Sequence, residues 1–201
     1  MDIQIKKGSG LIVTTKKYNI GVIAELSWDT TKSWKIDLDL FCAATSFNPI
    51  TKIYMLENMS ALLYHANLKC YDGALVHSGY EQTGVKEVDD EAITVFLNKL
   101  PVIITDVIIG ACIDPVKSIP LSTFKNAANA KITIRALVEG AGQLKEILSV
   151  NLQTKFTTGI LIGMYTRVGD NWHFETINQS VKCHTNTPIQ EILEAVPCDC
   201  L

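Results

Sequence analysis

Short runs of alternating or β-branched apolar residues, separated by turn residues, recur along the whole of this 201-residue chain. Successive side chains of a strand point to opposite faces, so such runs predict half-buried β-strands. Turns that recur every ten or so residues favour a two-sheet sandwich. The chain is therefore predicted to be mainly β, a two-sheet β-sandwich. Its predicted strands cover residues 8–15, 19–28, 35–44, 92–97, 102–113, 130–137, 144–152, 159–168 and 172–177.

Helical spacing is confined to the end of the chain. Between residues 188 and 196, four apolar residues fall on one helical face: Ile189, Ile192, Leu193 and Val196. Thr187 is a suitable N-cap, and Pro188 suits the first helical position. Residues 123–126 resemble a short helical turn, and residues 61–66 suit either a strand or a helical turn. We expect one domain over residues 1–201, with a C-terminal helix at about 188–196 and a tail at 197–201.

Composition and charge exclude several classes of protein. Hydrophobic residues make up 47% of the chain, enough for a large core. The net charge is −3, and no block of lysine and arginine provides the basic face that nucleic acid requires. The first residues lack the apolar core of a signal peptide, and the most apolar run, residues 100–113, is too short to span a bilayer. We expect a cytoplasmic protein without a transmembrane segment and without nucleic acid as a partner.

Motifs of common enzymes are absent. The chain has neither the glycine-rich phosphate loops nor the nucleophile elbow of hydrolases. His77 and Ser78 are adjacent, and a catalytic dyad there is the enzymatic alternative. Because adjacency in a loop does not make a triad, we expect no enzyme activity.

Five of the six cysteines fall into two groups. Cys42 and Cys112 lie in apolar runs and are predicted to be small buried hydrophobes. Cys183-His184 and Cys198-Asp199-Cys200 offer soft ligands for a metal, with free thiols as the alternative.

Two acidic segments of the sequence suggest a binding site for a hard cation. Asp37 and Asp39 are two positions apart on a predicted strand and therefore share a face. A turn-rich stretch, residues 77–91, ends in Asp89-Asp90-Glu91. Ca²⁺ takes six to eight oxygen ligands, and grouped carboxylates supply them. These residues alone leave two possibilities open: the two elements meet around a metal, or both are solvated surface.

The order of the motifs along the chain resembles that of the TerD family of tellurium-resistance and bacterial stress-response proteins. The resemblance covers almost the full length. It is carried by Lys7-Gly8, Trp28-Asp29, Asp37-Leu38-Asp39, Val76-His77-Ser78-Gly79, Thr83-Gly84, Asp89-Asp90-Glu91, Asn129-Ala130-x-Ile132, Gly163-x-Tyr165-x-Arg167 and Asn171-Trp172-x-Phe174. It implies a β-sandwich that binds Ca²⁺ in an acidic loop region and acts in tellurite and chemical stress resistance.

The resemblance also implies a set of metal ligands. Asp37 and Asp39 match the strand acids of the family, and Asp89, Asp90 and Glu91 match its acidic triplet. Thr83 matches a turn whose backbone carbonyl can bind the ion.

The first half of the loop departs from the family. Tyr80-Glu81 stands where the family has Asp-Asn, so Glu81 is the substitute ligand. Val85-Lys86-Glu87-Val88 replaces interleaved glycines, and the charge of Lys86 opposes Ca²⁺. We expect a non-enzymatic Ca²⁺-binding protein that retains at least one ion, with other proteins of a stress-response system as partners. The alternative is a structural or protein-interaction module of the same fold whose metal site is degenerate.

Overall fold

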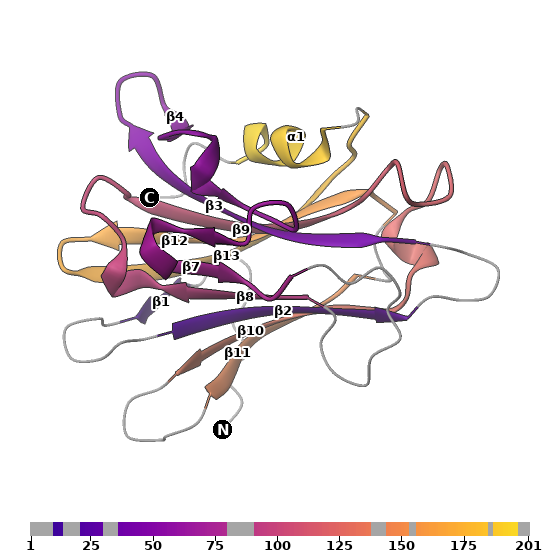
Figure 1. Cartoon of the computed structure of the whole chain (residues 1–201), viewed down its shortest axis with the longest axis horizontal. Coiled ribbons are helices and arrows are strands. Elements are labelled where there is room, and N and C mark those ends of the chain that lie inside the picture. The colour runs from indigo at the N-terminus through magenta and orange to yellow at the C-terminus, as the bar shows by residue number, and fades with distance from the viewer. Residues whose placement is uncertain are drawn as a thin grey trace.

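Two antiparallel sheets pack face to face, and one α-helix lies on the outer face of the larger sheet (Figure 1). The computed structural model describes residues 10–13, 21–29, 36–79, 91–137, 144–152, 156–184 and 187–196, and of residues 10–13, 137, 144 and 145 only the backbone. The predicted fold class, a mainly β two-sheet sandwich with helical turns and a C-terminal helix, is confirmed. Because residues 1–9 and 197–201 lie outside the described part, the extent of the domain over 1–201 stays a prediction.

The first sheet has seven strands among the described residues, in the order β1-β13-β12-β9-β3-β4, with β5 also paired to β3. In chain order these strands are β1 (Gly10–Val13), β3 (Leu38–Asn48), β4 (Ile53–Leu56), β5 (Leu62–Leu63), β9 (Asp106–Ile113), β12 (Gly159–Val168) and β13 (Asn171–Val181).

The second sheet has six described strands in the order β11-β10-β2-β8-β7-β6. They are β2 (Gly21–Asp29), β6 (Lys69–Cys70), β7 (Leu75–His77), β8 (Glu91–Phe96), β10 (Ala128–Leu137) and β11 (Leu144–Asn151). Short 3-10 turns connect strands of both sheets: η1 (Met59–Ala61), η2 (Tyr71–Gly73), η3 (Leu97–Lys99) and η4 (Phe124–Asn126).

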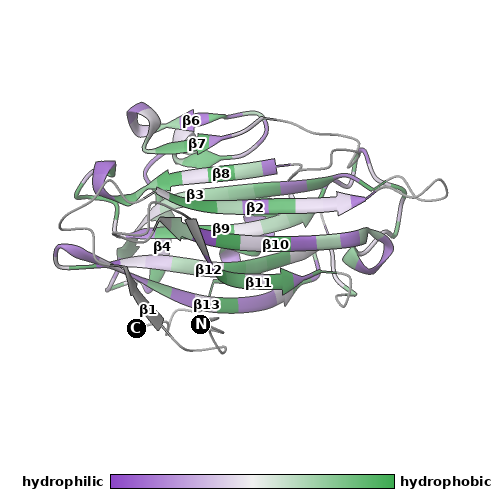
Figure 2. Cartoon of the chain, turned by 90° about the horizontal axis from the view of Figure 1, so that it is seen from below, coloured by the Kyte–Doolittle hydropathy of each residue, from purple (hydrophilic) through white to green (hydrophobic). Residues whose placement is uncertain are grey.

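The main core lies between the sheets. Alternate residues of β3, such as Leu38, Leu40 and Cys42, join Val22, Ile93 and others from the second sheet in one buried cluster. Figure 2 shows strands banded green and purple along their length, the alternation expected when one face is buried.

A second apolar layer covers the outer face of the first sheet. The helix α1 (Pro188–Glu194) lies over β9 and β12 and places Ile192 against a cluster that includes Phe41 and Ile108. β3 and β9 therefore have apolar neighbours on both faces, and every residue of β9 is buried. This double burial explains why their sequences are nearly continuous apolar runs.

The structure shifts several predicted strand boundaries. The strand predicted over 35–44 covers Leu38–Asn48, and the strand predicted over 172–177 continues to Val181. The strand predicted over 102–113 begins only at Asp106, and Val102 is 83% exposed. The reason is Arg167, which donates hydrogen bonds to the carbonyls of Leu100, Pro101 and Ile104, so a side chain takes the place of a strand partner. The segment 61–66 contains both predicted forms, the end of η1 and then β5.

The predicted C-terminal helix is confirmed, with Pro188 in its first turn. Thr187 is the N-cap residue, as predicted, but its side chain makes no capping hydrogen bond. Among the described residues, no helix is long and apolar enough to cross a membrane.

The described cysteines, 42, 70, 112 and 183, carry free thiols, and all but Cys183 are buried. The prediction that Cys42 and Cys112 are buried is confirmed. Cys198 and Cys200 lie outside the described residues.

Candidate cation site

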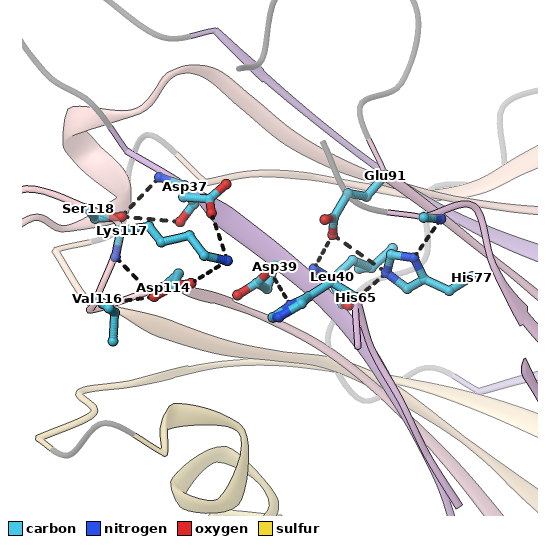
Figure 3. A network of polar contacts seen from close by, with 11 residues as sticks. Asp37, Asp39, Leu40, His65, His77, Glu91, Asp114, Val116, Lys117 and Ser118 are labelled. Carbon is cyan, nitrogen blue, oxygen red and sulfur yellow. Dashed lines mark hydrogen bonds and ion pairs between the residues drawn. The ribbon is translucent and has the colours of Figure 1, made fainter. Parts of the chain in front are cut away.

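Asp37 and Asp39 lie at the start of β3 and are buried, with exposed fractions of 1% and 4% (Figure 3). The predicted alternation holds, because Leu38 and Leu40 face the core between the sheets while Phe41 belongs to the outer cluster. The two acids are therefore not a solvated surface. Buried carboxylates must be neutralised or hydrogen-bonded, and the structure provides different partners for each.

A lysine in the segment that follows β9 lies beside Asp37 and offsets its negative charge. The Lys117 Nζ lies 2.9 Å from Asp114 Oδ2 and 3.7 Å from Asp37 Oδ2. Antiparallel pairing brings these segments together, since Leu38 lies opposite Ile113 and the Asp114 amide donates to the Asp37 carbonyl. One ammonium thus serves two carboxylates.

Asp114 is held in its charged form. Burial raises the pKa of this carboxyl, but hydrogen bonds from the Lys117 ammonium and from the amides of Val116 and Lys117 outweigh burial and lower the pKa overall. Both amides donate to Asp114 Oδ1, at 2.8 and 3.2 Å. Asp114 therefore belongs to the acidic group, although the sequence did not mark it.

Burial makes the charged form of the Asp39 carboxyl less favourable. Burial is the main cause that raises its pKa from 3.8 to about 6, against the lowering effect of His65, whose Nδ1 lies 2.8 Å from Asp39 Oδ1. The carboxylates of Glu91 and Asp114 also raise this pKa, while Lys117 lowers it. At neutral pH the buried carboxylates at the start of β3 therefore carry more negative charge than the nearby Lys117 and His65 offset.

Glu91, at the start of β8, is completely buried, and its side chain accepts a hydrogen bond from the backbone of β3. Its Oε2 accepts a hydrogen bond of 2.7 Å from the Leu40 amide, and the His77 Nε2 lies 3.2 Å from the Leu40 carbonyl oxygen. These two side chains take the place of a strand neighbour at the edge of β3. The other oxygen, Glu91 Oε1, is buried and has no hydrogen-bond partner among the residues that the structure describes.

His77 and Ser78 do not form a dyad. The His77 Nδ1 accepts a hydrogen bond from the Gly79 amide, so its Nε2 carries the proton and donates to Leu40. The Ser78 Oγ instead accepts from the Ala92 amide at 2.9 Å. Neither ring nitrogen is available as a base for Ser78.

The remaining predicted ligands, Glu81, Thr83, Asp89 and Asp90, lie outside the described residues, as do Tyr80 and Lys86. Within the described ranges, no three side chains of His, Cys, Asp or Glu are grouped closely enough to hold a metal. Cys183 Sγ lies 3.7 Å from the Pro188 carbonyl oxygen. Because Cys198 and Cys200 lie outside the described residues, the soft-metal site stays a prediction.

The donor set nevertheless fits a hard cation better than a soft one. Asp37, Asp39, Asp114 and Glu91 supply only oxygen (Figure 3), and Glu91 directly follows the segment 80–90 in the chain. Sequence reasoning found three of these acids. It missed Asp114, whose one signal was its position directly after an apolar strand.

Comparison with known proteins identifies the family. The model of the TerD domain matches residues 1–191. The chain belongs to the TerD family. Its relatives include YceE of Bacillus subtilis (strain 168), an uncharacterized protein that is 29% identical over 183 residues, which are 88% of this chain and 90% of YceE.

The tellurium resistance protein TerD of Serratia marcescens is 24% identical over 182 residues, 89% of this TerD-family chain and 91% of that protein. The crystal structure of a homologue of telluride resistance protein (TerD) from Streptomyces coelicolor A3(2) superposes with a TM-score of 0.65 at 20% identity. It covers 81% of this chain and 90% of the other. That likeness confirms the TerD-like fold.

Proposed function

We propose that this TerD-family protein binds Ca²⁺ at the start of β3 and acts, without enzymatic activity, in tellurite or chemical stress resistance in the cytoplasm. The observation that supports the proposal best is the state of Asp39, a buried carboxyl whose pKa is raised by burial and by two neighbouring acids. A divalent cation would relieve this excess of negative charge.

Asp37, Asp39 and Glu91 would hold the ion, together with Glu81, Asp89, Asp90 and the Thr83 carbonyl from the segment outside the described residues. The bound ion would supply positive charge that ties this segment to the sandwich. The family relatives named for tellurium resistance support the biological setting, and proteins of the same stress response are the proposed partners.

Thermal unfolding in Ca²⁺ and in EDTA tests the proposal. At a free Ca²⁺ concentration 100-fold above Kd, binding to the folded state alone stabilises by about 2.7 kcal/mol. Asp39→Asn and Asp90→Asn should each abolish most of that shift. Asp106→Asn is the matched control, because Asp106 is buried near the other end of β3, opposite Thr45, and its substitution should leave the Ca²⁺ response intact. The absence of both a shift in thermal unfolding and a calorimetric heat at millimolar Ca²⁺ would contradict the proposal.

A structural or protein-interaction module with a degenerate site is the second candidate. The contacts of Lys117 and His65 favour it, because the chain itself supplies positive groups beside Asp37, Asp114 and Asp39. In that case Asp39→Asn should maintain or increase stability equally in Ca²⁺ and in EDTA. A loss of stability that appears only with Ca²⁺ present would argue against this candidate.

A further inference from the structure

One lysine ammonium occupies the space between two of the acids at the start of β3. The Lys117 Nζ lies 2.9 Å from Asp114 Oδ2 and 3.7 Å from Asp37 Oδ2. The Asp37 side chain is 1% exposed, whereas that of Lys117 is 33% exposed. The lysine therefore reaches a buried carboxylate from the surface.

The backbone around Lys117 is fixed in the position that allows this reach. The Asp114 carboxylate accepts hydrogen bonds from the amides of Val116 and Lys117, which closes a turn after β9. The Ser118 hydroxyl accepts from the Asp37 amide at 2.9 Å, and the Ser118 amide donates to the Asp114 carbonyl at 3.0 Å. These bonds tie the turn to the strand that carries Asp37 and Asp39.

We infer that Lys117 is a built-in counter-ion of the cation site, and that Ca²⁺ must displace its ammonium to bind. The inference rests on the proposed function, since it concerns the same carboxylates. The ammonium already lies beside Asp37, one of the carboxylates that would hold the ion, and two cations at one carboxylate repel each other, so the lysine and the ion compete. The exposed part of the lysine gives the flexible stem a route into solvent when the ion enters.

Competition has two consequences for the protein. Without Ca²⁺ the lysine offsets part of the negative charge of Asp37 and Asp114, which favours folding of the sandwich without metal. With Ca²⁺ the free energy of separating the lysine from both acids is subtracted from the binding free energy, so affinity is lower than the donor set alone would give. Lys117 is thus a residue that sets the affinity of the site without touching the ion.

Calorimetric titration of metal-stripped protein with CaCl₂ tests this role. Lys117→Gln should bind Ca²⁺ more tightly than the wild type, by about 5- to 150-fold, the usual range of coupling between competing or cooperating ligands. Lys117→Arg keeps the charge and should not tighten binding. Lys125→Gln is the matched control, because it removes the same charge from η4, where the Lys125 Nζ lies over the Phe156 ring rather than between acids.

The outcomes separate this inference from the proposed function. Equal affinity of Lys117→Gln and wild type would overturn the inference and leave Ca²⁺ binding standing. Equal tightening by Lys125→Gln would also overturn it, because net charge alone would then explain the effect. Absence of binding in every protein would overturn the proposed function together with the inference. Binding by Lys117→Gln alone would support the inference and show that the lysine dominates the wild-type site.

A measurement on the wild-type protein covers the case in which Lys117→Gln does not fold. Displacement by Ca²⁺ should raise the rate at which an amine reagent such as acetic anhydride labels Lys117, measured by mass spectrometry, while labelling of Lys125 stays constant. Unchanged labelling of Lys117 at a saturating Ca²⁺ concentration would contradict the inference.

Discussion

Two buried aspartates near opposite ends of the β3–β9 pair differ in the charge of their hydrogen-bond donors. Asp114 accepts from an ammonium and two amides, and its pKa is lowered. Burial raises the pKa of Asp106, and the hydroxyls of Thr105 and Thr166, at 2.6 and 2.8 Å, only partly oppose this. A neutral hydroxyl stabilises a carboxylate less than a cation does, so burial dominates at Asp106.

The raised pKa of Asp106 predicts a pH dependence of stability. In the folded protein this carboxyl binds its proton more tightly than in the unfolded chain, so its contribution is present at low pH. That contribution is lost as pH rises from the ordinary value of 3.8 through the higher folded value. Each unit of pKa difference corresponds to about 1.4 kcal/mol. Asp106→Asn should flatten this fall, measured by urea unfolding between pH 4 and 7 in EDTA.

Thr166→Val provides the comparison for this prediction. It removes one donor from Asp106 and should steepen the fall of stability with pH, because the carboxylate loses a stabilising bond. Identical pH profiles of wild type and Asp106→Asn would show that Asp106 is not the group responsible.

At the scale of single elements, β9 tolerates no side chain at position 110. A Cβ at Gly110 would lie 2.4 Å from Phe41 Cζ and 2.8 Å from the Ile160 carbonyl oxygen. The Phe41 ring packs under α1, and the Ile160 carbonyl belongs to the neighbouring strand β12, so neither can retreat easily. Gly110→Ala should therefore destabilise by about 1–3 kcal/mol, the usual cost of overpacking, in chemical unfolding.

Gly21→Ala in β2 is the matched control. The nearest atom to its added Cβ would be Phe96 Cε1 at 3.6 Å, an ordinary contact. Its effect should stay within about 0.5 kcal/mol. Equal destabilisation by both substitutions would mean that a general effect of the added methyl group, rather than the Phe41 contact, controls the response.

The strands were predictable because their determinants are local. Alternation in segments such as β2 and β10, and the turn residues Gly169-Asp170 between β12 and β13, are visible in the sequence and need no knowledge of partners. The late start of β9 was not visible. Val102 and Ile103 favour a strand by composition, and only Arg167, more than 60 residues away, shows that the carbonyls of this segment are occupied.

The candidate site was predictable only in part, for the same reason. Asp37 and Asp39 could be placed on one face from their spacing. Their partners could not be predicted, because Ser118 is 81 residues from Asp37 and is brought to it by the pairing of β3 with β9. The structural role of Glu91 likewise depends on Leu40, 51 residues away.

At the scale of the whole molecule, the buried apolar residues form two separate clusters, and we expect the outer one to be lost without unfolding the other. The main cluster lies between the sheets, whereas Ile192 and Val196 belong to the outer cluster with Phe41, Ile108 and Met164. Ile192→Asp places a charge in the outer layer alone and should detach α1. The sandwich should remain, with its far-ultraviolet β signal intact and with new binding of the dye ANS to the uncovered face of the first sheet.

Gln190→Asp is the control, because it introduces the same side chain at an exposed position of the same helix. It should leave dye binding unchanged. Loss of the β signal in Ile192→Asp would contradict the separation, since it would show that the sandwich depends on the outer layer.

Burial of the cysteines also determines how this protein meets oxidants. Burial raises the pKa of the Cys42, Cys70, Cys112 and Cys183 thiols, and at Cys183 a hydrogen bond with Thr158 only partly opposes it. The thiolate, not the thiol, is the nucleophile, so these four sulfurs react slowly with electrophiles near neutral pH. Oxidants that react with exposed thiolates would therefore reach these four sulfurs only slowly while the protein stays folded.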